Sequence, residues 1–386
     1  MPELMVIQLR PRSAFLLGRR GVGQEATGNH LPADTLFAAL MAAWAEWGGR
    51  PEEWLAGFPT SGGPGGEILR SAQNDSPPFL LTSAFPFAGG VRFYPKPMLA
   101  FDVGEQSKAL KKAHFVSEQI FRWMLAGEPP ATWLPPQNGN TAHPTVTLQH
   151  GALWLTQDEY AHLPDGLRFV DGNRRKERSR RALNEMSVYM VDKVPRVTVD
   201  RLRHASEIYH TGRLSFAPEC GLWLGVQWVR PDAPFPGADR PYRQVFLDML
   251  TALGDQGLGG ERSAGYGAFE VEPQAAPLRF GDPAAGGLFV TLSRYHPRPD
   301  ELPATLSSEG AAYQLEAVGG WLKSLGVVTQ RRRRVWMCAE GSVCRAVGDG
   351  PWGDVVDVQP RYEKVTSDMH PVWRYGLACA VGTGGG

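Results

Sequence analysis

The sequence predicts an α+β protein built from two ferredoxin-like (RRM-like) domains with loop and hairpin insertions. Stretches of period-two and of helical hydrophobic spacing alternate along the chain as β-α-β-β units, which is the connectivity of such domains. The length of 386 residues accommodates two of them. We therefore expect an N-terminal domain over residues 1–195 and a second domain over residues 196–386, which holds central strands and a glycine-rich loop.

The individual elements follow from hydrophobic periodicity and from turn residues. Helices are predicted at residues 36–47, 115–125, 243–253 and 313–325. Strands are predicted at residues 4–10, 79–87, 91–97, 196–201, 214–216, 222–229, 268–271, 288–295, 334–338 and 373–381. A basic loop is expected at residues 108–112, ahead of the second helix. Insertions are expected near 58–78 and within 127–181, where glycine, proline or arginine dominate.

The charge balance of the chain bears on which kind of nucleic-acid-binding protein it can be. The chain has 40 basic and 40 acidic residues, so its formal net charge is zero. A free-standing nucleic-acid binder is usually basic, and neutrality instead favours a subunit that meets RNA on one face and proteins on others. Two basic runs, residues 174–181 and 331–334, keep RNA binding open, although such runs are often only solvated surface.

Four widely separated cysteines and short apolar runs indicate a cytoplasmic protein with reduced thiols. No apolar run approaches the roughly 18 to 20 residues that a membrane helix needs. The cysteines form no CxxC pair, and the histidines do not lie at ligand spacing from them. We expect no metal, no cofactor and no membrane contact.

The strongest local signal is the glycine-rich loop at residues 257–267 (GLGGERSAGYG). Its glycines permit positive φ and close backbone approach, and exposed amides in such loops can bind phosphate. Arg262 adds a cation and Tyr266 a stacking face. An ordinary flexible turn is the alternative interpretation. The loop residues predicted to bind RNA are Gly257, Gly259, Gly260, Arg262, Ser263, Gly265, Tyr266 and Gly267.

Two residues near the first helix have competing interpretations. His30 can contact RNA, serve as a general base in RNA cleavage, or have a purely structural role. Asp34 lies where a helix N-cap belongs, and we interpret it as that cap.

Several stretches, taken together, resemble the fourth-subunit family of type III-A (Csm) CRISPR effector complexes. They are residues 31–40 (LPADTLFAAL), 79–87 (FLLTSAFPF) with 93–97 (FYPKP), 196–201 (RVTVDR), the glycine-rich loop, and 340–343 (EGSV) with 370–376 (HPVWRYG). The loop is similar to the signature loop of the repeat-associated (RAMP) superfamily. The matches occur in the family's order over nearly the whole chain, which makes the resemblance specific.

The resemblance implies a non-catalytic subunit of the Cas-five group that grips the 5′ tag of the CRISPR RNA in antiviral defence. Its expected partners are the large polymerase-like Cas subunit, the backbone RAMP nuclease subunit and, through a protruding hairpin, target RNA. We place that hairpin within residues 200–216, where Arg201, Arg203, His204 and His210 gather. Two alternatives remain, namely a CRISPR-RNA processing endoribonuclease that uses His30 and a protein-only scaffold.

Overall fold

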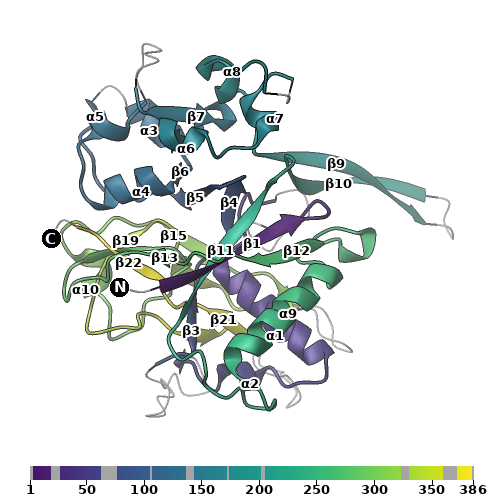
Figure 1. Cartoon of the computed structure of the whole chain (residues 1–386). Coiled ribbons are helices and arrows are strands. Elements are labelled where there is room, and N and C mark those ends of the chain that lie inside the picture. Colours follow the sequence, from purple (N-terminus) through teal and green to yellow (C-terminus); the bar gives the residue numbers. More distant parts are fainter. Residues whose placement is uncertain are drawn as a thin grey trace.

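The computed structural model describes residues 3–18, 27–61, 76–104, 107–135, 143–171, 174–200, 205–322, 330–359 and 372–384. Figure 1 shows a lower body, an upper lobe and a long two-stranded ribbon that projects from between them. The mixed α+β class is confirmed by this arrangement of several sheets with few long helices.

The largest sheet joins the lower body to the upper lobe. Its main path runs in the spatial order β12-β1-β11-β4-β5-β6-β8-β7, while β13 pairs with β1 and β3 pairs with β11. These strands are β1 (Glu3–Pro11), β3 (Phe79–Leu81), β4 (Phe85–Ala88), β5 (Val91–Pro95), β6 (Phe115–Ser117), β7 (Thr145–Leu148), β8 (Leu153–Thr156), β11 (Cys220–Trp228), β12 (Phe269–Pro273) and β13 (Leu278–Arg279). The predicted hairpin is confirmed, because β4 and β5 pair in antiparallel fashion.

Two long helices, α1 (Ala33–Glu46) and α9 (Tyr242–Gln256), lie side by side in the lower body (Figure 1). Apart from the elements inserted after α1 and after β3, the chain order is β1-α1-β3-β11-α9-β12, and these strands lie as β12-β1-β11-β3 in space. This is the connectivity of a ferredoxin-like unit. The division into two such domains at residue 195 stays a prediction.

The upper lobe surrounds β5 to β8 with short helices (Figure 1). They are α3 (Ser107–Lys112), α4 (Glu118–Leu125), α5 (Pro130–Trp133), α6 (Gln157–Tyr160), α7 (Asp165–Arg168) and α8 (Arg180–Asn184), with a 3₁₀ turn at Gln149–Gly151. The predicted basic loop at 108–112 is wrong, since these residues form α3. Lysine, alanine and leucine are good helix formers, and their propensity decided the local structure.

The ribbon consists of β9 (Tyr189–Asp200) and β10 (Ala205–Phe216), paired in antiparallel fashion along their whole length. Both predicted strands in this region are confirmed, and both extend well beyond the predicted bounds. In Figure 1 the ribbon lies outside the body over most of its length.

The C-terminal part contributes small sheets to the lower body. It contains β14 (Leu288–Thr291) between β19 (Val343–Arg345) and β22 (Ala380–Gly382), and β15 (Leu315–Val318) paired with β18 (Val335–Cys338). A further sheet joins β2 (Thr60–Ser61), β20 (Val355–Asp357) and β21 (Trp373–Tyr375), and β16 (Trp321–Leu322) pairs with β17 (Gln330–Arg331). The remaining short helices are α2 (Glu52–Leu55), α10 (Ala304–Ser307) and a 3₁₀ turn at Arg262–Ala264.

The predicted helix at 313–325 is wrong, because β15 and β16 occupy this region. Gly319 and Gly320 lie between them and interrupt any helix. Pairing with β18 also buries Val318, so tertiary contact favoured the strand.

One hydrophobic core runs from the first strand to the last and includes Leu4 and Val381. Phe37 of α1 packs against Tyr375 of β21, with 5.1 Å between ring centroids. The C-terminal part is therefore packed directly on the helix that the first strand leads into.

Candidate nucleic-acid interface

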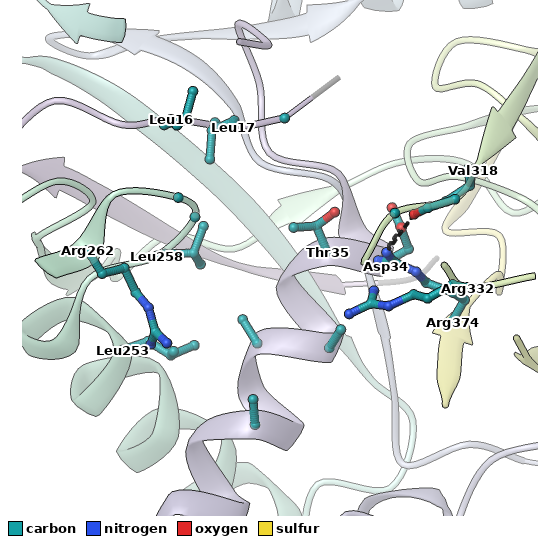
Figure 2. A pocket seen from close by; sticks show the side chains of 18 of the residues that line it. Leu16, Leu17, Asp34, Thr35, Leu253, Leu258, Arg262, Val318, Arg332 and Arg374 are labelled. Atoms are coloured by element: carbon teal, nitrogen blue, oxygen red, sulfur yellow. Dashed lines mark hydrogen bonds and ion pairs between the residues drawn. The ribbon is translucent and has the colours of Figure 1, made fainter. Parts of the chain in front are cut away.

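A cavity of about 560 Å³ lies between α1, the glycine-rich loop at residues 257–267 and the C-terminal part of the chain. Small side chains of α1 form part of its wall, namely Ala38, Ala39, Ala42 and Ala43. Figure 2 shows Arg262 on the loop side of α1, with Arg332 and Arg374 on the opposite side. The cavity thus joins the strongest sequence motif to a group of arginines far away in the chain.

The glycine-rich loop is fixed against the segment that follows β1. Gly259 has φ of +97° and a Cβ there would lie 2.5 Å from the Leu16 carbonyl oxygen, while Gly267 has φ of +85° and a Cβ would lie 2.2 Å from the Leu258 carbonyl oxygen. Both positions therefore require glycine for the packing of the chain itself. Gly265 has φ of +83° but open space around its Cβ position.

Most amides of the loop are already used within the protein. Gly260 donates to the Leu16 carbonyl and Gly267 donates to the Ala14 carbonyl. The amides of Gly259, Arg262 and Ser263 have no acceptor in the part of the chain that the structure describes. A ligand would thus meet a few loop amides rather than a continuous row of them.

The predicted site residues of the loop do not all face the cavity. Gly257, Gly259, Gly260 and Arg262 line it, whereas Ser263, Gly265, Tyr266 and Gly267 lie outside its lining. Arg262 is half exposed and lies 4.0 Å from Glu46 of α1. The ring of Tyr266 faces the Arg196 guanidinium of β9, 5.5 Å from the ring centroid.

Asp34 organises the other side of the cavity. Its side chain is completely buried, and its two oxygens accept hydrogen bonds from Arg294 at 3.2 Å and Arg374 at 2.9 Å. The N-cap of α1 is Pro32, and the Ala33 amide donates to the Ser83 hydroxyl and not to Asp34, so the interpretation of Asp34 as a cap is wrong. Its carboxylate is instead the counter-charge of two buried arginines (Figure 2).

The two arginines are held by further acceptors. Arg294 also donates to Glu316 at 2.8 Å, and Arg374 donates to the Gly319 carbonyl at 3.3 Å. Burial lowers the pKa of Arg294, but the carboxylates of Asp34, Glu340 and Glu316 outweigh burial and hold the pKa above its ordinary value. Burial and the charge of Arg294 lower the pKa of Arg374, against the attraction of Asp34.

The charge of Arg332 is attracted by the Asp34 carboxylate, which already pairs with Arg294 and Arg374. Within the described residues its guanidinium forms no ion pair and no hydrogen bond. Burial and the nearby Arg374 lower its pKa to about 10, so it stays charged at neutral pH. The lining contains four arginines (262, 294, 332 and 374) and one carboxylate, that of Asp34. Such an excess of positive charge in a partly enclosed space attracts an anion.

His30 lies in a second polar cluster, next to the cavity's arginines. Its Nε2 is 3.4 Å from Glu340 Oε1, its Nδ1 is 3.2 Å from Asn29 Oδ1, and its ring stacks near Phe85. Ser83 donates a hydrogen bond of 2.5 Å to Glu340. Burial raises the pKa of Glu340, but His30, Arg294 and Ser83 outweigh it and lower the pKa to about 2.

The other predicted site residues lie on the ribbon. His210 is exposed on β10, opposite Pro195 of β9, and does not reach the cavity. Arg201, Arg203 and His204 lie outside the described residues. The site prediction for the ribbon therefore stays a prediction.

The arginine-rich run at 174–181 is partly committed to local structure. Arg174 pairs with Asp165 at 2.7 Å, and Arg180 donates to the carbonyls of His143 and Thr145. Arg181 is exposed and forms no ion pair with the residues that the structure describes. The run is thus in part a folded loop rather than a free cationic surface.

Sequence reasoning missed Asp34, Arg294, Arg332 and Arg374 as a group. Arg332 belongs to the basic run at 331–334, which was noted, but nothing local distinguishes it from its neighbours. Only the fold brings these four residues together. Among the described residues there is no helix able to span a membrane, and no group of three His, Cys, Asp or Glu side chains placed to hold a metal ion.

Comparison with known proteins identifies the C-terminal part. Residues 285–383, which hold three of the four cavity arginines, match the family model of the CRISPR Csm4 C-terminal domain. This part of the chain is therefore similar to the C-terminal domain of Csm4 proteins. The predicted resemblance to the fourth-subunit family is thereby confirmed.

Partial matches to curated proteins agree with this result. The chain is 29% identical over 171 residues to the CRISPR system Cms protein Csm4 of Mycobacterium tuberculosis, which covers 43% of this chain and 48% of that protein. It is 31% identical over 189 residues to the Csm4 of Thermococcus onnurineus, covering 49% and 53%. The chain thus spans about half the length of the curated Csm4 proteins it matches.

A similar fold occurs in the crystal structure of a Csm3-Csm4 subcomplex of the type III-A CRISPR-Cas interference complex. One chain of that structure superposes with a TM-score of 0.59 over 98% of both chains, at 15% identity. At this identity the likeness shows a shared fold alone.

Proposed function

We propose that the chain is a non-catalytic, RNA-binding subunit of a type III-A CRISPR (Csm) complex that grips the 5′ tag of the CRISPR RNA. The observation that carries this proposal is the cavity beside the glycine-rich loop, whose lining holds four arginines and one carboxylate, with no ion pair to Arg332 among the described residues. The similarity to the Csm4 C-terminal domain supports the assignment to such a complex. Its proposed protein partners are the large polymerase-like subunit and the backbone RAMP nuclease subunit.

The geometry suits a phosphate of the RNA backbone. Arg332 has free donors, and Arg262 and the Gly259 amide approach the same cavity from the other side. Asp34 fixes Arg294 and Arg374 before any ligand arrives, so little ordering is needed on binding. Phosphate contacts of this kind position an RNA without reading its sequence.

The ribbon supplies a second proposed contact, with the duplex between CRISPR RNA and target RNA. Large apolar side chains are exposed on it, including Val197 at 57% and Ile208 at 67%. A projecting strand pair with exposed apolar residues can wedge between stacked bases at low cost in solvation. This contact depends on assembly of the complex.

The endoribonuclease alternative has one supporting observation, which is the carboxylate of Glu340 beside His30. The arrangement does not suit acid–base work, however. A carboxyl whose pKa lies at about 2 is not protonated near neutral pH, and both ring nitrogens of His30 face protein groups.

We expect the purified chain not to cleave labelled CRISPR repeat RNA, with or without divalent metal ions. Denaturing gels of the products are the measurement. Cleavage by the wild type that disappears in His30→Ala would replace our proposal by the endoribonuclease.

The phosphate-binding role is tested by Arg332→Gln. Removing a buried cation without a partner should leave folding intact, while RNA affinity should fall about tenfold at low salt. The slope of log affinity against log salt should fall by about 0.7, the value for one lost contact with a single strand. The matched control is Arg181→Gln, an exposed arginine far from the cavity lining. Equal effects of the two substitutions would show non-specific attraction and not a site.

A further inference from the structure

The two-stranded sheet of β15 and β18 has one buried face and one open face. Val318, Val335 and Met337 are buried together on one side. On the other side Cys338 is buried, whereas Trp336 is 57% exposed and Leu315 is 43% exposed. Tyr313, two residues before Leu315, is 41% exposed. Single exposed apolar residues are ordinary on protein surfaces, but a tryptophan and a tyrosine at one short sheet are not.

This open face borders the arginine cavity. Ala317 pairs directly with Trp336 across the two strands, and Ala317 lines the cavity. Directly opposed residues have Cβ atoms about 4.5–5.5 Å apart, so Trp336 lies one side chain away from the cavity wall. The Arg332 amide donates to the Gly320 carbonyl at 2.9 Å, which ties the two strands together where the cavity begins.

One short segment therefore carries both a phosphate donor and an aromatic face. Arg332 and Trp336 are four residues apart, which is at most about 13 Å of extended chain. A single strand of about four stacked nucleotides covers that length at roughly 3.4 Å each. Arg334, which is exposed between the two, adds a further cation at the surface.

We propose that the open face of β15 and β18 is a nucleobase-stacking site, with Trp336 as its platform and Tyr313, four residues before Trp336's partner Ala317, as a second aromatic contact. The ligand is single-stranded RNA, one of whose phosphates occupies the Arg332 cavity. This inference rests on the proposed RNA-binding function and extends it to a defined surface. A nucleotide supplies both the flat aromatic face that an exposed tryptophan favours and the negative charge that the adjoining cavity favours.

The test compares Trp336→Ala, Trp336→Phe and Arg332→Gln in the full chain. Binding of a fluorescently labelled, unstructured 12-nucleotide RNA is measured by anisotropy at several salt concentrations. The second probe is an abasic ribose-phosphate strand of equal length, which keeps the charges and lacks the bases. Because Trp336 is exposed, its substitutions should not unfold the protein, and thermal melting checks this. Tyr313→Ala provides an independent variant of the same face.

We expect Trp336→Ala to weaken RNA binding about 5- to 150-fold, the range for one lost base stack, with an unchanged salt slope. Trp336→Phe should bind RNA within about threefold of the wild type. The wild type, Trp336→Ala and Trp336→Phe should all bind the abasic strand with the same affinity. Tyr313→Ala should weaken RNA binding in the same salt-independent way.

Two results would overturn the stacking site while the proposed function stands. In the first, Trp336→Ala binds RNA as tightly as the wild type while Arg332→Gln binds it weakly. A Trp336→Ala protein that loses a protein partner but keeps its RNA affinity belongs to this case. The other is an equal loss by Trp336→Ala on the abasic strand. A wild type that binds neither probe would overturn the proposed function itself, and the stacking site with it.

Discussion

At the scale of single residues, Asp34 determines how the cavity is charged. Its buried carboxylate holds two arginines that would otherwise repel each other and Arg332. Removing one charged partner from such a buried group typically lowers the free energy of unfolding by about 3–5 kcal/mol, because the remaining charges are then buried without compensation. The residue therefore supports the cavity structurally, and the partner that we propose for the charge that remains is an RNA phosphate.

Glu340 gives a pH dependence of stability that can be tested. Its pKa in the folded protein is about 2, against an ordinary value of 4.5. A lowered pKa stabilises the fold fully above pH 4.5 and loses that contribution as the pH falls towards 2. Between pH 6 and pH 3 this loss is about 2 kcal/mol, since the unfolded chain takes up the proton first.

We therefore expect the free energy of unfolding of the wild type to fall about 2 kcal/mol more than that of Glu340→Gln over this pH range. Urea unfolding at both pH values is the measurement. The exposed Glu309→Gln serves as the control and should follow the wild type. Parallel pH curves for wild type and Glu340→Gln would show that the buried cluster does not hold this carboxylate ionised.

At the scale of elements, the glycine-rich loop has a structural requirement besides its proposed binding role. A side chain at Gly259 would clash with the Leu16 backbone. A side chain at Gly265 would have open space around it, and its only cost would be the strain of the positive φ. We expect Gly259→Ala to lower stability clearly more than Gly265→Ala, which should cost about 1 kcal/mol. Thermal and urea unfolding of the two variants is the measurement. A Gly259→Ala protein as stable as Gly265→Ala would mean that the loop does not rest on Leu16.

Local sequence patterns predicted many of these elements, among them α1, the hairpin of β4 and β5, and the strands of the ribbon. They failed where long-range contacts or a competing signal decided the outcome. At 313–325 the apolar spacing fits a helix, but β18 pairs with β15 and two glycines interrupt the segment. The glycine-rich loop was found because its signal is local. The arginine group was not, because Asp34, Arg294 and Arg374 meet only in the fold.

At the scale of the whole molecule, the N-terminal strand–helix unit and the C-terminal part share one core and one set of buried charges. Asp34 and His30 precede or begin α1, while their partners Arg294, Arg374 and Glu340 all lie beyond residue 290. The cavity is formed only when these parts are together. A net charge of zero provides no long-range attraction for RNA, so local charge in the cavity must supply it.

The central claim is that this cavity holds CRISPR RNA within an assembly. The most direct measurement is to purify the tagged chain from its host, with its partners, and to sequence the RNA that accompanies it. We expect CRISPR RNA with an intact 5′ tag to be strongly enriched with the wild type and with Arg181→Gln, and to be largely lost with Arg332→Gln. Assemblies that contain no CRISPR RNA, or that retain it fully in Arg332→Gln, would contradict the account.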